Sequence, residues 1–322
     1  MEYIRNKESQ NKIKKVEENM IDILMATYNG ERYLDVQISS IVNQTYKDWR
    51  LYIRDDGSLD NTVNIIKKWE NLDNRIIVIQ DEKKIGNPGS NFLELLKYST
   101  ADFICFCDQD DYWFENKLEK MLEVANNQIN DKPFLVLSNC FIWEYQKFYI
   151  SLKRVIYYAD TLEQYLFMNG GLQGCAMLFN SALRNLIAGK EIKHLYMHDH
   201  IISLLAYTFG SVIYMEEPLF LYRQHESNVS IHLEQLNTKQ KVFRSNLKNK
   251  YPVVNTSIYK SIEEFFNIYK EKMSNKSKVI FQNYLRFVNA NKLSRILIML
   301  KNNFSLGRDG KFKLFIKILL RG

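Results

Sequence analysis

The 322-residue chain is predicted to be an α/β protein, with a mostly parallel, Rossmann-like sheet flanked by helices and a basic helical C-terminal region. Three observations predict this fold. Short apolar runs alternate with amphipathic stretches from residue 21 to residue 107, polar clusters directly follow three of these runs, and basic residues dominate after residue 235. An alternation of strands and helices requires a parallel sheet, because a crossover helix must return the chain to the starting edge.

The strand and helix pattern repeats along the first third of the chain. Residues 21–24 are apolar, the turn Tyr28-Asn29-Gly30 follows, and a helical stretch runs to Val42. The same order predicts strands at 51–54, 76–79 and 103–107 and helices at 62–69 and 92–98, with a breaker loop at 86–90. Later apolar runs predict strands at 134–140, 176–179, 212–215 and 219–222, and helices at 181–188 and 198–207.

Charge is distributed unevenly along the chain. Residues 239–322 contain 19 Lys and Arg and 4 Asp and Glu, a net charge of +15. The whole chain has 44 and 37 such residues, so residues 1–238 hold 25 and 33, a net charge of −8. The two parts are therefore expected to contact different partners.

The N-terminal residues and the cysteines predict a cytoplasmic location. Residues 1–18 are polar and charged where a signal peptide would carry an apolar segment. No apolar run reaches the roughly 18 residues that a membrane-spanning helix needs, so membrane contact would be peripheral, on the inner face of the cell membrane. The four cysteines lack the paired spacing of a zinc site and are predicted to be reduced core thiols.

Carboxylates cluster directly after the strand at 103–107. Asp108, Asp110 and Asp111 would repel one another unless a cation compensates them. Mg²⁺ or Mn²⁺ prefers such oxygen ligands and keeps open positions for phosphate oxygens. A solvated acidic loop, or the N-cap of a helix at 113–124, is the alternative interpretation of the same residues.

A second acidic pair, Asp55-Asp56, closes the strand at 51–54. Taken alone, this pair followed by Gly57 is typical of a turn. At the end of a parallel strand, however, a carboxylate can accept the imide N–H of uracil or thymine. The loop at 86–90 lacks a P-loop ending and no GxGxxG follows the first strand, so ATP and NAD are not expected as cofactors.

Together these motifs resemble those of the family 2 glycosyltransferases, over about residues 20–230. The resemblance rests on Ala26-Thr27-Tyr28-Asn29-Gly30, Asp55-Asp56-Gly57-Ser58 and Cys107-Asp108-Gln109-Asp110-Asp111. It implies the A-type fold of inverting enzymes. The implied nucleotide-binding residues are Ala26, Thr27, Tyr28, Asp55, Asp56 and Asp108. By position, Asp56 would contact the base, and Asp110 would be the principal ligand of a divalent metal, Mn²⁺ or Mg²⁺.

Later motifs are similar to those of bacterial rhamnosyltransferase-like members. They are Gly170-Gly171-Leu172-Gln173-Gly174-Cys175-Ala176, His198-Asp199-His200 and Tyr222-Arg223-Gln224-His225-Glu226-Ser227-Asn228-Val229-Ser230. The resemblance makes Asp199 the general base, with His198 where the family often has Glu, and His225 a metal ligand. The implied diphosphate or acceptor contacts are Arg223, Gln173, His198 and Trp113. A helix N-cap for Asp199 and a structural role for His225 stay open as alternatives.

The implied reaction moves a sugar from a UDP- or dTDP-sugar, with dTDP-rhamnose as a candidate, to a glycan or lipid-linked acceptor in bacterial surface polysaccharide synthesis. The implied organisation is a polar lead at 1–19, a catalytic domain at 20–235 and a basic helical region at 236–322. The catalytic domain would divide into a nucleotide-sugar half, 20–115, and an acceptor half, 116–235. A non-catalytic nucleotide-binding or scaffold protein of the same fold is the alternative, against which the intact carboxylates argue.

Two C-terminal stretches predict amphipathic basic helices. Apolar residues recur at helical spacing at Leu293, Ile296, Leu297 and Leu300, and again at Phe312, Phe315, Ile316 and Leu319. Lys311, Lys313, Lys317 and Arg321 are interleaved with the second set. These faces either pack on the catalytic domain or meet an anionic membrane surface, which attracts basic segments. Nucleic acid is not expected as a partner, because no zinc-finger, RRM or KH signature accompanies the charge.

Overall fold

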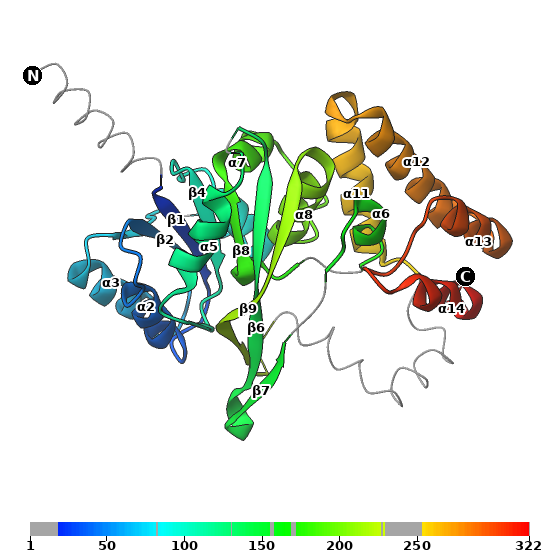
Figure 1. Cartoon of the computed structure of the whole chain (residues 1–322). Helices are drawn as coiled ribbons and strands as arrows, with labels where there is room; N and C mark the ends of the chain where they lie inside the picture. Colours follow the sequence, from blue (N-terminus) through cyan, green and yellow to red (C-terminus); the bar gives the residue numbers. More distant parts are fainter. Residues whose placement is uncertain are drawn as a thin grey trace, which may run out of the picture.

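The computed structural model describes residues 19–81, 83–129, 131–154, 158–168, 172–226, 228 and 253–321, with the side chains of 152–154 and 321 left out. Residues 1–18, Gly170, Gly171, Ser227, Val229, Ser230 and the predicted boundary near residue 235 lie outside the described residues. Within the described part, a sheet covered by helices carries a group of C-terminal helices at one end (Figure 1).

One sheet forms the centre of the protein, with the strand order β3-β2-β1-β4-β8-β6-β9-β5 and with β7 paired to β6. Four strands of its first half are parallel to one another: β1 (Ile21–Thr27), β2 (Trp49–Asp55), β3 (Ile76–Val78) and β4 (Phe103–Cys107). Thr27 lies opposite Asp55 and Met25 lies opposite Cys107, so β1, β2 and β4 end at the same edge. The predicted α/β class is confirmed.

The second half of the sheet is joined through antiparallel pairs. It consists of β5 (Tyr112–Trp113), β6 (Phe134–Glu144), β7 (Tyr149–Arg154), β8 (Met177–Asn180) and β9 (Ser211–Gln224). β8 is antiparallel to both β4 and β6, whereas β6 and β9 are parallel. The strands predicted at 212–215 and 219–222 are one continuous strand. Pro218 is tolerated inside it because it sits at a register shift opposite Asn139, where the ladder is interrupted.

Helices cover the sheet between the strands. They are α2 (Leu34–Val42), α3 (Thr62–Leu72), α4 (Pro88–Leu95), α5 (Lys117–Asn126), α6 (Leu162–Tyr165), α7 (Ser181–Ile187) and α8 (His198–Phe209). The loop predicted at 86–90 runs into the first turn of α4. Asn87 caps this helix, because its side chain accepts the N–H of Ser90 at 2.9 Å. α5 begins later than the predicted helix at 113–124, because Tyr112 and Trp113 pair with β9 instead.

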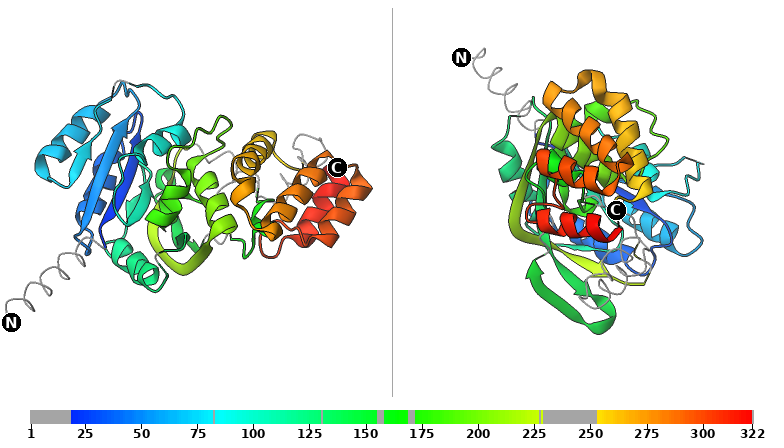
Figure 2. Two further views of the ribbon diagram at one scale, coloured as in Figure 1. Left: turned by 90° about the horizontal axis from the view of Figure 1, so that it is seen from above. Right: turned by 90° about the vertical axis from the view of Figure 1, so that its right-hand side faces the viewer.

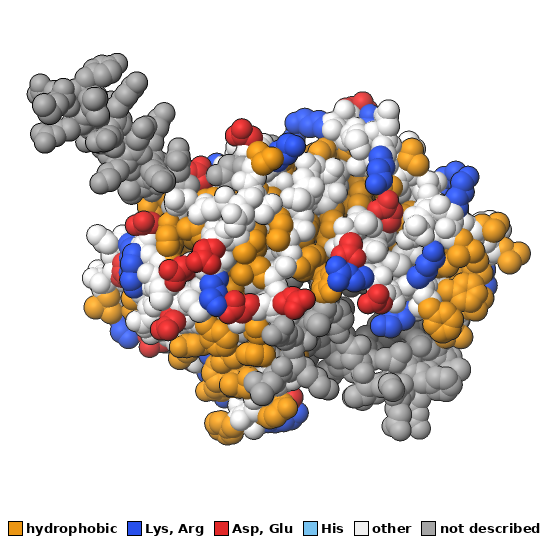
Figure 3. Space-filling view, viewed as in Figure 1, with side chains coloured by type: hydrophobic (Ala, Val, Ile, Leu, Met, Phe, Trp, Pro, Cys, Tyr) orange, Lys and Arg blue, Asp and Glu red, His pale blue; other side chains and the backbone are white. Residues whose placement is uncertain are grey.

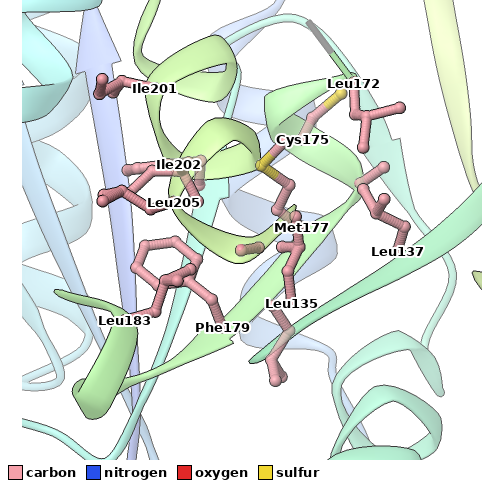
Figure 4. Packing of buried hydrophobic residues seen from close by; sticks show 14 of the residues in the cluster. Leu135, Leu137, Leu172, Cys175, Met177, Phe179, Leu183, Ile201, Ile202 and Leu205 are labelled. Carbon is pink, nitrogen blue, oxygen red and sulfur yellow. The ribbon is translucent and has the colours of Figure 1, made fainter. Parts of the chain in front are cut away.

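The core between α8 and the sheet holds the start of α8 in place. Ile202 and Leu205 of α8 pack with Met177 and Phe179 of β8, and all four are fully buried (Figure 4). Burial of such a side chain stabilises the fold by about 1.5–3 kcal/mol. All four cysteines are also buried, and none of them forms a disulfide, as predicted.

The C-terminal helices form a bundle beyond α8, at the opposite end of the molecule from β1, β2 and β3 (Figure 2). They are α11 (Thr256–Tyr269), α12 (Asn275–Asn289), α13 (Lys292–Lys301) and α14 (Lys311–Arg321). Phe304, between α13 and α14, is fully buried, and its ring centroid lies 4.9 Å from that of Phe167, which follows α6. Arg308 forms a two-pronged ion pair with Asp160. The bundle is therefore attached through a buried aromatic contact and a surface ion pair.

The faces that α13 and α14 bury differ from the apolar faces predicted from the sequence. Met299, Leu314 and Ile318 are buried. Of the predicted positions, only Ile296 and Phe315 are partly buried against the core. The others stay exposed and form what we call the apolar stripe: Leu293, Leu297, Leu300, Phe312, Ile316 and Leu319, together with Leu320. Figure 3 shows hydrophobic side chains gathered over this end of the molecule.

Replacement of Phe304 by Ala should destabilise the protein by about 3–5 kcal/mol, because it removes a buried aromatic side chain and leaves a cavity. Phe312→Ala is the matched control: its side chain is 70% exposed, and its loss should change the free energy of unfolding by less than about 0.5 kcal/mol. Urea unfolding measures both. Equal effects of the two replacements would show that Phe304 does not hold the bundle.

Candidate active site

Three loops meet at the carboxyl edge of β1, β2 and β4 and form the floor of a cleft. Ala26, Thr27 and Tyr28 end the first strand, Asp56 follows the second and Asp108 follows the third. All five line a single cleft of about 1680 Å³. The three sequence motifs therefore meet where the parallel topology predicts.

Asp55 and its neighbour Asp56 face different surroundings. The Asp55 carboxylate accepts hydrogen bonds from Thr27 Oγ1 at 2.9 Å and from the backbone N–H groups of Gly57 and Ser58 at 3.0 and 2.7 Å. The hydroxyl of Ser58 also donates to it. Asp55 does not line the cleft; its carboxylate stabilises the turn, so the predicted nucleotide contact has no support from its position.

Asp56 lines the cleft and holds the loop that follows β3. Its two oxygens accept the backbone N–H groups of Ile85 and Gly86, each at 2.7 Å, and Arg54 Nη1 lies 3.3 Å away. A carboxylate has further lone pairs, so a ligand N–H can still bind here. Arg54 is buried and also pairs with Asp81 at 2.8 Å. Sequence reasoning missed Arg54, although a cation inside an apolar strand before two carboxylates was the available signal.

Gln109 connects the first and third loops. Its side-chain amide donates to the carbonyl of Tyr28 and accepts the Tyr28 N–H, both at 3.0 Å. The amide lies directly over Gly30, where a Cβ would come within 2.4 Å of Gln109 Oε1. No sequence signal pointed to Gln109, but its position between two aspartates of the motif is explained by this bridge.

Asp110 and His225, the two predicted metal ligands, lie together in the cleft. His225 Nε2 is 2.8 Å from Asp110 Oδ2, and Asn228 Nδ2 donates to the same oxygen at 3.3 Å. The His225 ring stacks on Tyr33 at 4.4 Å between centroids. The end of β9 thus brings to Asp110 two side chains that are 115 and 118 positions away along the chain.

Asp108 and Asp111 are carboxylates with little compensating charge. Burial, followed by the neighbouring Asp110, raises the pKa of Asp108 to about 7. The same two causes raise the pKa of Asp111 well above its usual value. Asp111 Oδ1 accepts the backbone N–H of Arg223 at 3.0 Å, while its buried Oδ2 has no hydrogen-bond partner among the described residues.

A divalent metal fits this end of the cleft. Asp110 and His225 offer an oxygen and a nitrogen that already face each other, and both line the cleft. Mn²⁺ accepts this mixed set and Mg²⁺ favours the carboxylates. Ligand atoms of Asp108, Asp111 and Cys175 also lie within 4.8 Å of one another. Burial, followed by repulsion from Asp110, raises the pKa values of Asp108 and Asp111, and a cation near these groups would offset both effects.

Asp199 lies in the first turn of α8 and faces the same cleft. Burial raises the pKa of its carboxyl to about 7, against the opposing effect of the backbone N–H groups of His200 and Gly174. The N–H of His200 donates to Oδ1 at 2.6 Å. A carboxyl group with this pKa is ionised for about half the time at neutral pH and is suited to proton transfer.

His198 supports Asp199 from an apolar pocket. Its ring stacks on Phe92 at 3.9 Å and meets Phe106 edge-on at 4.6 Å. Burial lowers the pKa of His198 to about 3, so the imidazole is neutral. Gly174 is required beside it, because a Cβ there would lie 2.5 Å from His198 Nε2. A neutral imidazole avoids the cost that an ionised Glu would meet between the rings of Phe92 and Phe106.

The remaining predicted contacts differ in position. Gln173 lines the cleft. Arg223 does not: it is buried under the carboxylate loop, donates from Nε to the Asp110 carbonyl at 2.6 Å and lies 4.1 Å over the ring of Trp143. Trp113 is fully buried and also lies outside the cleft lining. Arg223 and Trp113 therefore support the loop, which corrects their predicted contact with diphosphate or acceptor.

The cleft extends from Asp199 to the C-terminal bundle. The cleft is lined by Asp110 and Asp199 and also by Leu306, Arg308, Lys313 and Lys317. Sequence reasoning expected these helices to pack or to meet a membrane and did not place them at the site. Their position at the cleft could not be predicted from local sequence, because it depends on the tertiary contact between the loop before α14 and Tyr158.

Comparison with known proteins gives the following relatives. Residues 22–187 match the family described as Glycosyl transferase family 2. The dTDP-rhamnosyl transferase RfbG of Shigella flexneri is 31% identical over 222 residues, which cover 63% of this chain and 72% of that protein. The UDP-Glc:alpha-D-GlcNAc-diphosphoundecaprenol beta-1,3-glucosyltransferase WfgD of Escherichia coli is 38% identical over 109 residues, 34% of this chain and 42% of that protein.

Solved structures share the fold at low sequence identity. TarS 1-349 of S. aureus, in complex with UDP, matches with a TM-score of 0.54 at 16% identity, covering 94% of this chain and 90% of that one. Mannosyltransferase PcManGT from Pyrobaculum calidifontis, in complex with GDP-Man and Mn²⁺, matches with a TM-score of 0.50 at 11% identity and covers 94% and 84%. The likeness to these two structures concerns the fold.

Proposed function

We propose, since this chain belongs to glycosyl transferase family 2 and is a glycosyltransferase, that it moves one sugar from a UDP- or dTDP-sugar onto a glycan or lipid-linked acceptor by a single displacement. The observation that carries this proposal is the presence of Asp56, Asp110 and Asp199 in one cleft. The three carboxylates would serve base recognition, metal binding and proton transfer, in that order.

The donor nucleotide would bind on the carboxyl edge of the parallel strands, where ligands of open α/β sheets usually bind. Asp56 would accept the imide N–H of uracil or thymine with the lone pairs left by Ile85 and Gly86. Ala26, Thr27 and Tyr28 would line the nucleoside. Asp110 and His225 would hold Mn²⁺ or Mg²⁺, and a bound metal of this kind offsets negative charge on a leaving diphosphate.

Asp199 would act as the general base. Its carboxylate takes the proton of the acceptor hydroxyl as that oxygen forms a bond to the anomeric carbon, and the bond from this carbon to the nucleoside diphosphate breaks. The leaving group departs with the bonding electrons, and the sugar inverts its configuration. The neutral His198 beside Asp199 cannot compete for the proton, because its pKa is lowered to about 3.

The relatives support a role in surface polysaccharide synthesis. RfbG is named for a dTDP-rhamnosyl donor, which favours dTDP-rhamnose for this chain. WfgD is named for a UDP-glucose donor and an acceptor on diphosphoundecaprenol, which favours a lipid-linked diphosphate acceptor. A non-catalytic scaffold of the same fold is the alternative. It would gain nothing from a carboxyl group desolvated to a pKa of about 7 beside a cleft.

Association with an anionic membrane surface is part of the proposal. No helix in the described ranges is long and apolar enough to cross a membrane. The apolar stripe on α13 and α14 is exposed and lies among lysines, the pattern of a helix that rests in a bilayer interface. Such a surface would bring the enzyme to a lipid-linked acceptor.

Asp110→Asn should abolish metal-dependent turnover and leave the fold intact, because the replaced group would bind the metal and lies in the cleft. The measurement is sugar release from UDP- and dTDP-sugars, including dTDP-rhamnose, across a Mn²⁺ titration. Asp131→Asn, an exposed aspartate outside the cleft lining, is the control. A near wild-type rate of the Asp110 variant at limiting Mn²⁺ would refute the metal assignment.

The pH dependence of kcat/KM should show an acid limb near pH 7. The base works as a carboxylate, so activity is lost as pH falls through the Asp199 pKa of about 7, by about tenfold per pH unit below it. Asp199→Asn should remove the limb and lower turnover by about 10²–10⁴-fold, with little change in donor affinity. Asp108→Asn should keep the limb. If Asp108→Asn removes the acid limb and Asp199→Asn keeps it, Asp199 is not the base.

The double replacement of Leu297 and Ile316 by Ser should weaken binding to vesicles of phosphatidylglycerol and phosphatidylcholine by at least tenfold, because each buried apolar side chain contributes about 1.5–3 kcal/mol. Leu59→Ser, which changes an exposed leucine after β2 and outside the apolar stripe, is the control. Co-sedimentation measures the binding. Wild-type protein that ignores anionic vesicles, or a double variant that binds normally, would contradict membrane association.

A further inference from the structure

Lys313 and Lys317 lie one helical turn apart on α14 and line the cleft that contains Asp199. Residues at i and i+4 share one face of a helix. The adjoining face carries Leu314 and Ile318, which are fully buried, so packing fixes the direction in which the lysines point. Lys313 is exposed and forms no ion pair within the described residues.

The wall that carries these lysines is fixed to the catalytic part. The backbone N–H of Arg308 donates to the carbonyl of Tyr158 at 3.2 Å, and its guanidinium pairs with Asp160. Two carboxylates, Glu216 and Asp309, line the same cleft as the lysines. The lysines therefore lie in a mixed-charge wall in which Asp160 is already engaged by Arg308.

We infer that Lys313 and Lys317 bind a phosphate group of the acceptor. This inference rests on the proposed function, because it names what the acceptor side of that cleft recognises. The donor diphosphate would bind at Asp110 and His225, so the positive charge on this wall of the cleft is placed for a different anionic group. An ammonium is a compact charge with three donors that suits phosphate, whereas a neutral sugar hydroxyl needs no charge.

The apolar stripe supports a lipid-borne phosphate over a soluble one. Phe312, Ile316 and Leu319 lie on the flank of α14 that is exposed, next to the lysine face. A bilayer in contact with that flank would place its phosphate level beside the mouth of the cleft. The lysines would then hold the phosphate of the acceptor while its sugar extends toward Asp199.

Binding of geranyl diphosphate to the full-length protein tests the inference. Calorimetry in metal-free buffer with saturating UDP keeps the probe out of the donor site. Lys313→Gln combined with Lys317→Gln should weaken binding by about tenfold or more. Lys311→Gln should not, because Lys311 is on the same helix but donates to Asn303 outside the cleft lining. Geraniol, which lacks the phosphates, should not distinguish the variants.

Three results would overturn the inference. The double variant binds geranyl diphosphate like the wild type, Lys311→Gln loses as much affinity, or monomeric dihexanoyl phosphatidylglycerol competes at the same concentration. The last result would assign the lysines to bilayer headgroups instead of the acceptor. The proposed function is tested by a different measurement: if the wild-type enzyme releases sugar from none of the donors, the proposed function is wrong, whatever the lysine variants bind.

Discussion

The parallel register of β1, β2 and β4 is the constraint on which the site depends. Because these strands end at one edge, the carboxylates that follow them must share a small volume, where their charges repel. Arg54 offsets the charge at Asp56, and the backbone of Arg223 supplies one hydrogen bond to Asp111. Burial, followed by the neighbouring Asp110, still raises the pKa of Asp108 to about 7. The edge of the sheet therefore stays negatively charged, and a bound cation would balance this charge.

The end of β9 completes this edge from the other half of the sheet. Arg223 lies under the carboxylate loop, while His225 and Asn228 reach Asp110 from the same segment. Their spacing along the chain lets Arg223 support the backbone of the loop while His225 and Asn228 contact the Asp110 carboxylate. Because β9 also pairs with β5 directly after the loop, the loop is held on both sides.

The sequence predicted the parallel half of the sheet and the meeting of the three motifs, because both follow from local periodicity and topology. It named Asp56 as the base contact but kept Asp55 among the nucleotide-binding residues, because the hydrogen bonds of Asp55 to Thr27 and to the turn are visible only in the structure. Gln109 and Arg54 were missed because their partners are far along the chain. The sequence left open whether the apolar faces of α13 and α14 pack or stay exposed, because each helix has two apolar stripes and only tertiary contacts select the buried one.

The attachment of the C-terminal bundle has a consequence for how such enzymes diversify. The part of the chain that matches the family ends at residue 187, whereas Asp199, His225 and the cleft wall around Arg308 lie beyond it. That wall is anchored by a buried phenylalanine and a surface ion pair, outside the strands that carry the acidic edge. Substitutions on the cleft side of this wall would therefore reshape the end of the cleft beyond Asp199 while leaving the strands of the acidic edge unchanged.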